Sequence, residues 1–205
     1  METNVPYRIE TERLVIRCPN PEDAEMAQEA ILNNLDHLSP WLPWTDQEPQ
    51  SLAERIALLR SFRSKFDAGE DFVYGIFNPR ETQMLGSTGL HTRRGTGIFE
   101  IGYWIDADHL NQGLATESTS ALIKAAFEIA DCRRVEIRCD PENVVSARIP
   151  RKLGFQMEGT LRHRDLFRGK PRDTQVWGLL ADEYPDSPAS KLVIKAYDAV
   201  GKLLS

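Results

Sequence analysis

The chain has 205 residues, of which 41% are hydrophobic, 27% charged and 8% aromatic. That length suits one domain around one core, and the composition excludes collagen, coiled-coil and disordered classes. No apolar run reaches the roughly 18 to 20 residues that cross a bilayer, and the first residues lack the basic-then-apolar layout of a secretory signal. Three cysteines without a metal-ligand spacing predict reduced thiols and no metal site. We therefore expect a cytoplasmic protein with no membrane contact.

The net charge of −6 argues against a general nucleic-acid binder, but the charge is unevenly distributed. Residues 133–172 hold eleven Lys or Arg against five Asp or Glu, a local excess of six positive charges. From charge alone, a solvated face is the simpler interpretation. A site for a phosphorylated ligand is the alternative, and it needs independent support from the motifs.

The first third of the chain predicts one strand and two helices. Apolar alternation over 14–18 indicates a half-buried strand, and apolar residues at helical spacing indicate a helix over 20–35. The segment SPWLPW at 39–44 ends that helix. A second helix is predicted over 51–69, opened by a serine–glutamate capping box.

The middle of the chain predicts an antiparallel meander followed by alternating helices and strands. The meander is expected over 71–77, 82–91 and 97–105. Further elements are a helix after Gly113, a strand around 135–139, a short helix near 146–152, and strands near 154–161 and 173–180. The fold class is α/β (α+β), one domain over 1–205 with a core at about 7–182, in which a mixed, mostly antiparallel sheet of six to seven strands is flanked by helices.

The C-terminal segment predicts one more helix. Ser187 suits a cap, Pro188 suits the first helical position, and five apolar residues recur at helical spacing over about 187–204. We expect a packed amphipathic helix that seals the core. A homodimer contact is the alternative role.

Two segments could carry chemistry. In GYWIDADHLNQGLATES (102–118) a strand leads through a short loop into a helix, with Gly113 and Ala115 allowing a ligand to approach the backbone closely. First-turn N–H groups can bind a pyrophosphate there. In DPENVVSARIPRKLGF (140–155), Asn143 follows a strand and Ser146 is expected to cap the short helix.

Together these segments resemble the GNAT superfamily of N-acetyltransferases, and within it the RimL-type ribosomal-protein serine acetyltransferases. The resemblance runs from TERLVIR at 11–17 through EIGYWID, NQGLATES, ENVVSARIPRKLGF and EGTLR to about Asp182. Gly113 and Ala115 fill the last two places of the family loop, Gln/Arg-x-x-Gly-x-Gly/Ala, and Leu110 stands at its first place. The resemblance implies a single GNAT-like domain and acetyl-CoA as co-substrate.

The resemblance also implies which residues hold acetyl-CoA. The backbone of Trp104 and Ile105 would hold the pantetheine and the thioester. The pyrophosphate would be bound by the loop amides of Gln112, Gly113, Leu114, Ala115 and Thr116. Asn143 and Ser146 would face the pantetheine arm, and Arg148, or alternatively Arg151 or Lys152, would meet a phosphate.

Acetyl transfer to an amine needs a neutral amine, a place for the developing oxyanion and a proton for the thiolate. As general base, Asp165 ranks slightly above Glu100, and Glu158 is a third candidate. The resemblance indicates Ser146 as proton donor, with His163 as a minor relay candidate. Each carboxylate could instead be a salt-bridged surface group among so many arginines.

The acceptor is the least constrained part of the prediction. Trp41 and Trp44 of SPWLPW either wall the acceptor pocket or fill the core, and His37 and His91 are expected to be structural. The expected function is direct transfer of an acetyl group from acetyl-CoA to a primary amine in a ternary complex, with the N-terminal α-amine of a protein such as a ribosomal protein as the expected acceptor. The alternatives are a small-molecule or antibiotic acetyltransferase, and a non-catalytic acyl-CoA sensor.

Overall fold

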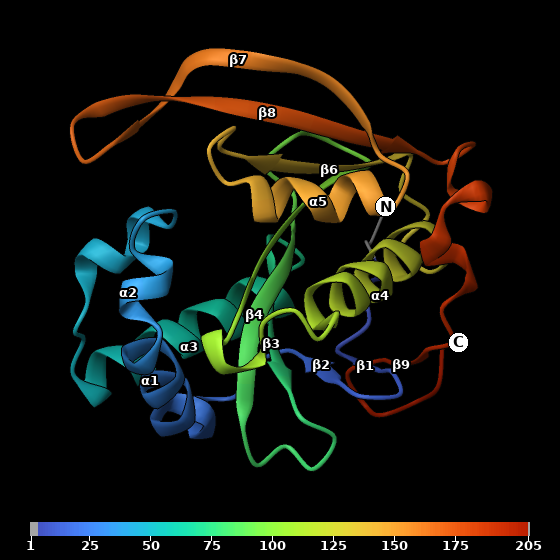
Figure 1. The fold of residues 1–205 in the computed structure, drawn as a ribbon. Helices are drawn as coiled ribbons and strands as arrows, with labels where there is room; N and C mark the ends of the chain where they lie inside the picture. Colours follow the sequence, from blue (N-terminus) through green and yellow to red (C-terminus); the bar gives the residue numbers. More distant parts are fainter. Residues whose placement is uncertain (1–3, 205) are drawn as a thin grey trace.

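The computed structural model describes residues 4–204, which form a single α/β domain built on one sheet (Figure 1). Within these residues the sheet has nine strands in the order β7-β8-β6-β5-β4-β3-β2-β1-β9, and β5 and β6 alone run parallel. The strands are β1 (Arg8–Glu10), β2 (Val15–Arg17), β3 (Phe72–Phe77), β4 (Met84–His91), β5 (Ile98–Ile105), β6 (Arg134–Cys139), β7 (Gln156–Phe167), β8 (Lys170–Leu180) and β9 (Lys195–Tyr197).

Helices cover both faces of the sheet and give the molecule two apolar cores. The larger core lies between the sheet and α4 (Leu114–Glu128), with α5 (Val144–Lys152) beside it. The smaller core lies on the other face, under α1 (Ala24–Asn33) and α3 (Leu52–Asp67), and the short α2 (Leu35–Leu38) follows α1. No helix in the described part of the chain is long and apolar enough to cross a membrane.

Most predicted elements are present where local signals were strong. The capping box of α3 forms as expected, with the Ser51 side chain accepting from the Glu54 N–H and the Glu54 carboxylate accepting from the Ser51 N–H. The meander forms as β3, β4 and β5. The strands predicted near 154–161 and 173–180 are longer, because they pair with each other beyond the sheet as one hairpin, β7–β8.

The prediction of a C-terminal helix over 187–204 is wrong. Two 3-10 turns, Tyr184–Asp186 and Pro188–Lys191, are followed by β9, which pairs with β1. Val193 and Val200, expected on the buried stripe, are 82% and 86% exposed. Pairing with β1 satisfies the backbone groups of a sheet edge, which a helix could not do.

The expected six to seven strands are nine for a related reason. β1 and β9 have three residues each and lie at the edge of the sheet. Three residues are too few for apolar alternation to be recognised in a sequence. Their pairing depends on partners distant in the chain.

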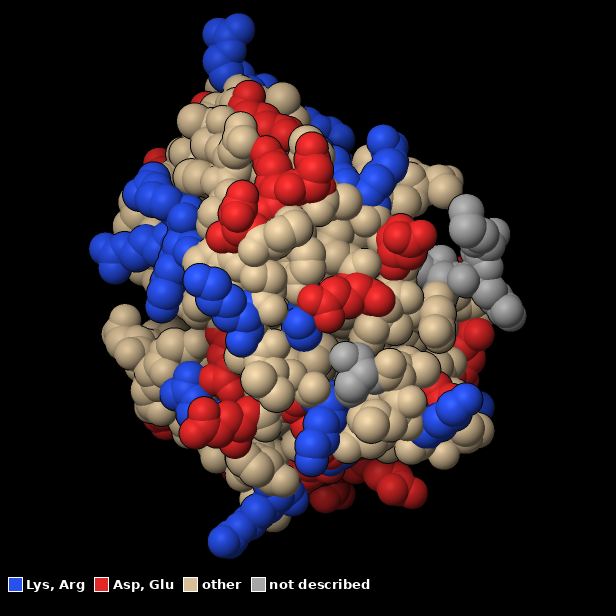
Figure 2. All heavy atoms as spheres, turned by 90° about the vertical axis from the view of Figure 1, so that its right-hand side faces the viewer, with Lys and Arg blue, Asp and Glu red and all other residues tan. Residues whose placement is uncertain are grey.

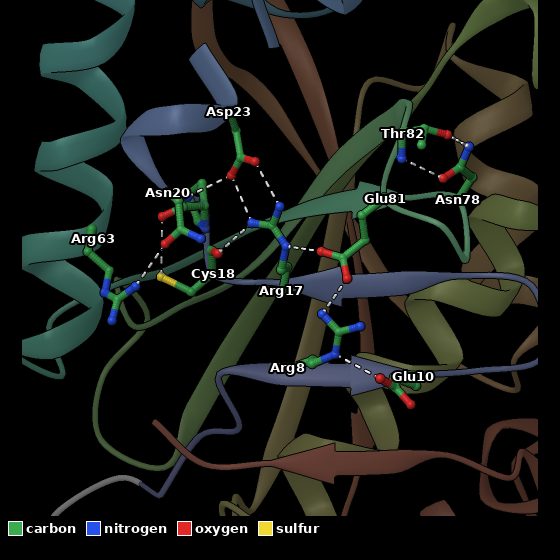
Figure 3. Close-up of polar contacts among 11 residues, drawn as sticks. Arg8, Glu10, Arg17, Cys18, Asn20, Asp23, Arg63, Asn78, Glu81 and Thr82 are labelled. Atoms are coloured by element: carbon green, nitrogen blue, oxygen red, sulfur yellow. Dashed lines mark hydrogen bonds and ion pairs between the residues drawn. The ribbon is translucent and has the colours of Figure 1, made fainter. Parts of the chain in front are cut away.

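A chain of charged groups ties β1 and β2 to the helical layer (Figure 3). Arg17 on β2 donates to both oxygens of Asp23 at 2.8 and 2.7 Å and to Glu81 at 2.5 Å. Glu81, in the β3–β4 turn, also pairs with Arg8 of β1 at 2.7 Å. On α3, Arg63 donates to Asn20 beside this group at 3.1 Å. The network fixes how α1 and α3 sit on the sheet.

Candidate active site

The parallel strands β5 and β6 separate partway along their length. Residues 98–101 of β5 pair with 134–137 of β6, and the pairing ends there. β5 continues to Ile105 and is paired on its other side with β4. Unpaired strand-edge N–H and C=O groups can take up an extended ligand. The stretch from Gly102 to Ile105, which includes the predicted Trp104, therefore borders a slot between the strands.

Two hydroxyl groups meet at this slot. The Tyr103 hydroxyl donates to the Ser146 carbonyl oxygen at 3.0 Å and lies 3.3 Å from Ser146 Oγ. Burial raises the pKa of Tyr103 well above its ordinary value, an effect that the hydrogen bond to Ser146 only partly offsets, so the phenol stays protonated. Sequence reasoning gave Tyr103 no role. Its position two residues before the end of β5 was the available signal.

The loop before α4 presents free amides. Asn111 and Gly113 have φ values of 60° and 81°, and Gly113 is the N-cap of α4. First-turn N–H groups make no bonds within their helix, so those of Leu114, Ala115 and Thr116 face outward. Arg13 steadies the loop: it donates to the Gln112 carbonyl at 2.8 Å and pairs with Glu117 at 2.5 Å.

A side chain on Gly113 would strain this loop. The left-handed backbone there, with φ of 81°, disfavours any residue with a Cβ, although a Cβ would have room, at 3.5 Å from Arg13 Nη2. The loop is therefore shaped for close approach of a ligand to the backbone. A sequence search for phosphate-binding side chains misses Arg13, which lies 100 residues away in the β1–β2 turn.

The start of α5 differs from its prediction by three residues. Asn143, not Ser146, is the N-cap, and its side chain accepts from the Ser146 N–H at 3.1 Å. Ser146 lies inside the first turn, which directs it at Tyr103. Arg148 is exposed on α5 and makes no ion pair or hydrogen bond with the described residues, whereas Arg151 lies over the Trp177 ring at 5.6 Å.

Four of the eleven Lys and Arg residues in 133–172 form ion pairs. Arg134 and Arg138 contact Glu136, Arg172 pairs with Asp140, and Arg168 pairs with Asp46. Figure 2 shows a cluster of basic side chains on the left of the view and acidic side chains grouped in its upper half, with both kinds also elsewhere on that face. Arg148, Arg151 and Lys152 of α5 are exposed and form no ion pair with the described residues, so they are available for a phosphate.

The predicted carboxylates lie apart from one another. Glu100, on β5, is 6% exposed, with one oxygen bound by Arg93 and the other by Arg94. Burial by itself would raise the pKa of Glu100, but these arginines bring it below its ordinary value. Asp165, exposed on β7, accepts a hydrogen bond from the Thr174 hydroxyl.

The other two candidates are also on β7. Glu158 forms a two-pronged ion pair with Arg134, with both distances 2.6 Å. This pairing lowers the pKa of Glu158. His163 is exposed, and its backbone N–H donates to the Asp173 side chain at 2.9 Å. The hairpin thus carries three predicted groups, and none of them lines either cavity described next.

A cavity of about 600 Å³ lies between β3–β5 and the layer of α1 and α3. It reaches Gly102, Tyr103 and Trp104, the stretch of β5 that borders the slot. Trp44 forms part of its wall. Such a volume is typical of small-molecule sites.

A second cavity of about 330 Å³ lies between SPWLPW and the tip of the β7–β8 hairpin. Trp41 and Phe167 are its aromatic walls, and the Arg172 guanidinium lies 5.9 Å from each ring. Next to it, Arg168 of the hairpin pairs with Asp46 at 2.7 Å. Figure 1 shows the hairpin reaching past the sheet toward α2. Trp41 and Trp44 therefore line two different cavities.

Comparisons with known proteins agree with this geometry. A model of the acetyltransferase (GNAT) domain matches residues 13–156. The [ribosomal protein uS5]-alanine N-acetyltransferase of Escherichia coli (strain K12) is 27% identical over 188 residues, covering 89% of this chain and 95% of that protein. An uncharacterized N-acetyltransferase, YoaA of Bacillus subtilis (strain 168), is 28% identical over 177 residues, covering 84% and 96%.

A solved structure extends the likeness to the whole fold. Mycobacterium smegmatis RimJ, in complex with CoA-disulfide, has a TM-score of 0.82 at 22% identity and covers 92% of this chain and 94% of its own. The family match spans the slot, the α4 loop and α5, the three parts of the site described above. The chain therefore belongs to the GNAT acetyltransferase family and is an N-acetyltransferase.

Proposed function

We propose that this protein transfers the acetyl group of acetyl-CoA to the α-amine of a protein N-terminus, such as that of a ribosomal protein, by direct transfer in a ternary complex. One observation carries the proposal: the larger cavity reaches Gly102–Trp104 from the face opposite α4. An amine in the cavity and a thioester along β5 can therefore meet without a covalent enzyme intermediate.

The residues present fit acetyl-CoA. The slot beside β5 suits the linear pantetheine, and the free amides at the start of α4 suit the pyrophosphate. Arg148 is available to a phosphate, and Asn143 and Ser146 lie at the slot. When bound, the coenzyme supplies an activated acetyl group. Ser146, whose Oγ lies beside the protonated Tyr103, is the proposed proton donor to the thiolate.

The cysteines support direct transfer. All three are buried, and burial raises the pKa of Cys18 to about 12 and that of Cys139 to about 11. Only the thiolate is an effective nucleophile. An acetyl-cysteine intermediate is therefore disfavoured at neutral pH.

The choice of an N-terminal α-amine rests on chemistry and on one relative. An α-amine has an ordinary pKa of roughly 7.7 to 8.0, against roughly 10.4 for lysine, so it needs little help to become neutral. The uS5-alanine acetyltransferase is related over nearly its whole length. Positioning of such an amine can supply about 7 to 11 kcal/mol of the barrier reduction.

A small-molecule amine is the second candidate. The Arg168–Asp46 ion pair links the hairpin to the segment between Trp44 and Gln47, two residues of the larger cavity's wall. An ion pair at this position would narrow the approach to the larger cavity from the hairpin side, which would favour a compact acceptor over a peptide.

Calorimetry with acetyl-CoA, NAD and ATP, followed by mass spectrometry of acceptors, tests the proposal. The acceptors are peptides that begin with Ala or Ser, the same peptides with a blocked N-terminus and one internal lysine, spermidine and an aminoglycoside. We expect selective acetyl-CoA binding and a gain of one acetyl group on the unblocked peptides only.

Other results would change the assignment. Acetylation of spermidine or the aminoglycoside alone would favour the small-molecule function. Acetylation of the blocked peptides would move the target to lysine. Acetyl-CoA binding without transfer to any acceptor would favour the sensor, and the absence of binding would contradict the cofactor assignment.

A further inference from the structure

An Asp–His pair lies in the wall of the larger cavity. His91, the last residue of β4, has Nδ1 2.8 Å from Oδ1 of Asp71, which precedes β3. An ionised carboxylate only accepts hydrogen bonds, so Nδ1 of the neutral ring must carry the proton. Nε2 then keeps its lone pair, and it makes no hydrogen bond with residues 4–204. From the sequence, His91, like His37, is expected to be structural.

The ring lies beside two glycines. A Cβ on Gly89 would come within 2.7 Å of His91 Nε2, too close to be accommodated without a shift, and a Cβ on Gly102 would be in ordinary contact with it at 3.6 Å. The ring therefore lies over the backbone of β4 and β5. Gly102 is the first residue of β5 beyond its pairing with β6. Nε2 thus lies beside the stretch of β5 along which the proposed function puts the thioester.

The neighbouring charges leave His91 as the free base in this region. Glu100 is directly opposite it in the β4–β5 register, but both Glu100 oxygens are held by Arg93 and Arg94. On the helical side of the cavity, the charges are Asp23 and the buried Arg55–Glu48 pair at 2.5 Å. Neither Glu100 nor Asp165 lines the cavity, whereas His91 and Asp71 both do.

We propose that His91 is the general base of acetyl transfer and that Asp71 is its positioning residue; this inference rests on the proposed function. His91 Nε2 takes one proton from the bound ammonium group, and the nitrogen lone pair so exposed forms the bond to the acetyl carbon. The carbon–sulfur bond breaks with its electron pair on sulfur; Ser146 Oγ gives its proton to that sulfur and is reprotonated by the second amine proton. His91 then releases its proton to water. Ammonium and thioester thus give amide, thiol and one proton.

The first test compares His91→Gln with His37→Gln, the same change on α2, where His37 makes no hydrogen bond with the described residues. We expect His91→Gln to lower kcat on an Ala-initiated peptide by about 10²- to 10⁴-fold, the usual contribution of one general base, with acetyl-CoA affinity by calorimetry within about twofold of wild type. The acidic limb of the kcat–pH profile should disappear in this variant. His37→Gln should keep the wild-type rate and profile.

A second readout does not need turnover. With four histidines in the chain, long-range ¹H–¹⁵N spectra of ¹⁵N-histidine protein can identify the His91 ring by its loss in His91→Gln. We expect an Nδ1–H tautomer, and we expect Asp71→Asn to weaken that preference and to lower kcat by at least about tenfold. Asp71→Asn also serves if His91→Gln fails to fold.

Distinct outcomes overturn the two proposals. If wild type acetylates no amine, the proposed function fails, and the role of His91 with it. If wild type is active and His91→Gln is equally active, or if the ring is the Nε2–H tautomer, only the role of His91 fails. A full loss of rate in Asp165→Asn together with an active His91→Gln would assign the general base to Asp165 on the β7–β8 hairpin.

Discussion

The two cavities are flanked by ion pairs that differ in their burial and in their number of partners. On the side of β2 and α1, Arg17 and Asp23 are 14% and 11% exposed and belong to a network of several partners (Figure 3). On the hairpin side, Arg168 and Asp46 are 48% and 47% exposed and form a single pair. Asp23 lines the larger cavity, and Arg168 lines the smaller one.

We interpret the β2–α1 side as a fixed wall and the hairpin side as an adjustable one. Partly buried, multiply bonded charges are costly to separate, because each group left behind loses its partner in a poorly solvated place. An exposed pair is worth about 0 to 1 kcal/mol and can open without such a cost. We therefore expect the β2–α1 side to fix the position of the cavity, and the hairpin to set which acceptors enter it.

Breaking the network should have the largest effect. Arg17→Met keeps packing over Phe77, whose ring lies 4.2 Å from the guanidinium, but it leaves Asp23 without its cation and Glu81 with Arg8 alone. We expect a loss of about 3 kcal/mol in the free energy of unfolding, measured by urea denaturation. Arg60→Met, an exposed position on α3, is the matched control. Equal stabilities for the two variants would contradict the fixed-wall interpretation.

Acid should weaken the same side, by a smaller amount. Burial by itself would raise the pKa of Glu81, but hydrogen bonds from Arg17 and Arg8 lower it. A carboxylate with a lowered folded-state pKa adds stability above its unfolded pKa, roughly 4.3, and loses it as the pH falls through the folded value. The free energy of unfolding should be steady from pH 7 to about 5 and fall below roughly pH 4.

Glu81→Gln tests the assignment of that fall. The variant should show a shallower loss of stability below roughly pH 4 than wild type, in urea titrations at each pH. Glu29→Gln, an exposed change on α1, should leave the profile as it is. A Glu81→Gln profile identical to that of wild type would assign the acid sensitivity to other carboxylates.

Opening the hairpin should have the smallest effect on stability and a visible one on selectivity. Arg168→Gln removes the exposed pair with Asp46, so the free energy of unfolding should change by less than about 1 kcal/mol. The ratio of kcat/KM for a long peptide to that for spermidine should rise by up to about fivefold. Arg162→Gln, elsewhere on the same hairpin, is the control. An unchanged ratio would mean that this pair does not restrict the acceptor.

Local signals predicted much of this fold. The capping box at Ser51, the glycine at 113 and the alternation of β3 to β5 each depend on neighbours within a few residues, and each element forms there. The C-terminal segment shows the limit of such signals. Its apolar spacing fits a helix, but part of it pairs as β9 with the edge of β1, which lies almost 190 residues earlier in the chain.

The candidate site divides in the same way. Gly113, Asn143 and Ser146 were recognisable because their motif is local. The contacts of Tyr103 with Ser146, of Arg13 with the α4 loop and of His91 with Asp71 span 43, about 100 and 20 residues. No local pattern indicates them.

The sequence by itself predicted the family, through a resemblance, the α/β class and the two segments proposed to face the coenzyme, because those depend on short-range backbone requirements for glycine, caps and strand alternation. Only the tertiary structure decided which ionisable groups are bound by neighbouring side chains and which keep an atom without a hydrogen-bond partner. Glu100 is held between two arginines, while His91 on the neighbouring strand keeps an open nitrogen in the cavity. The physical reason is that a side chain's protonation and reach depend on the charges and space that distant segments bring to it.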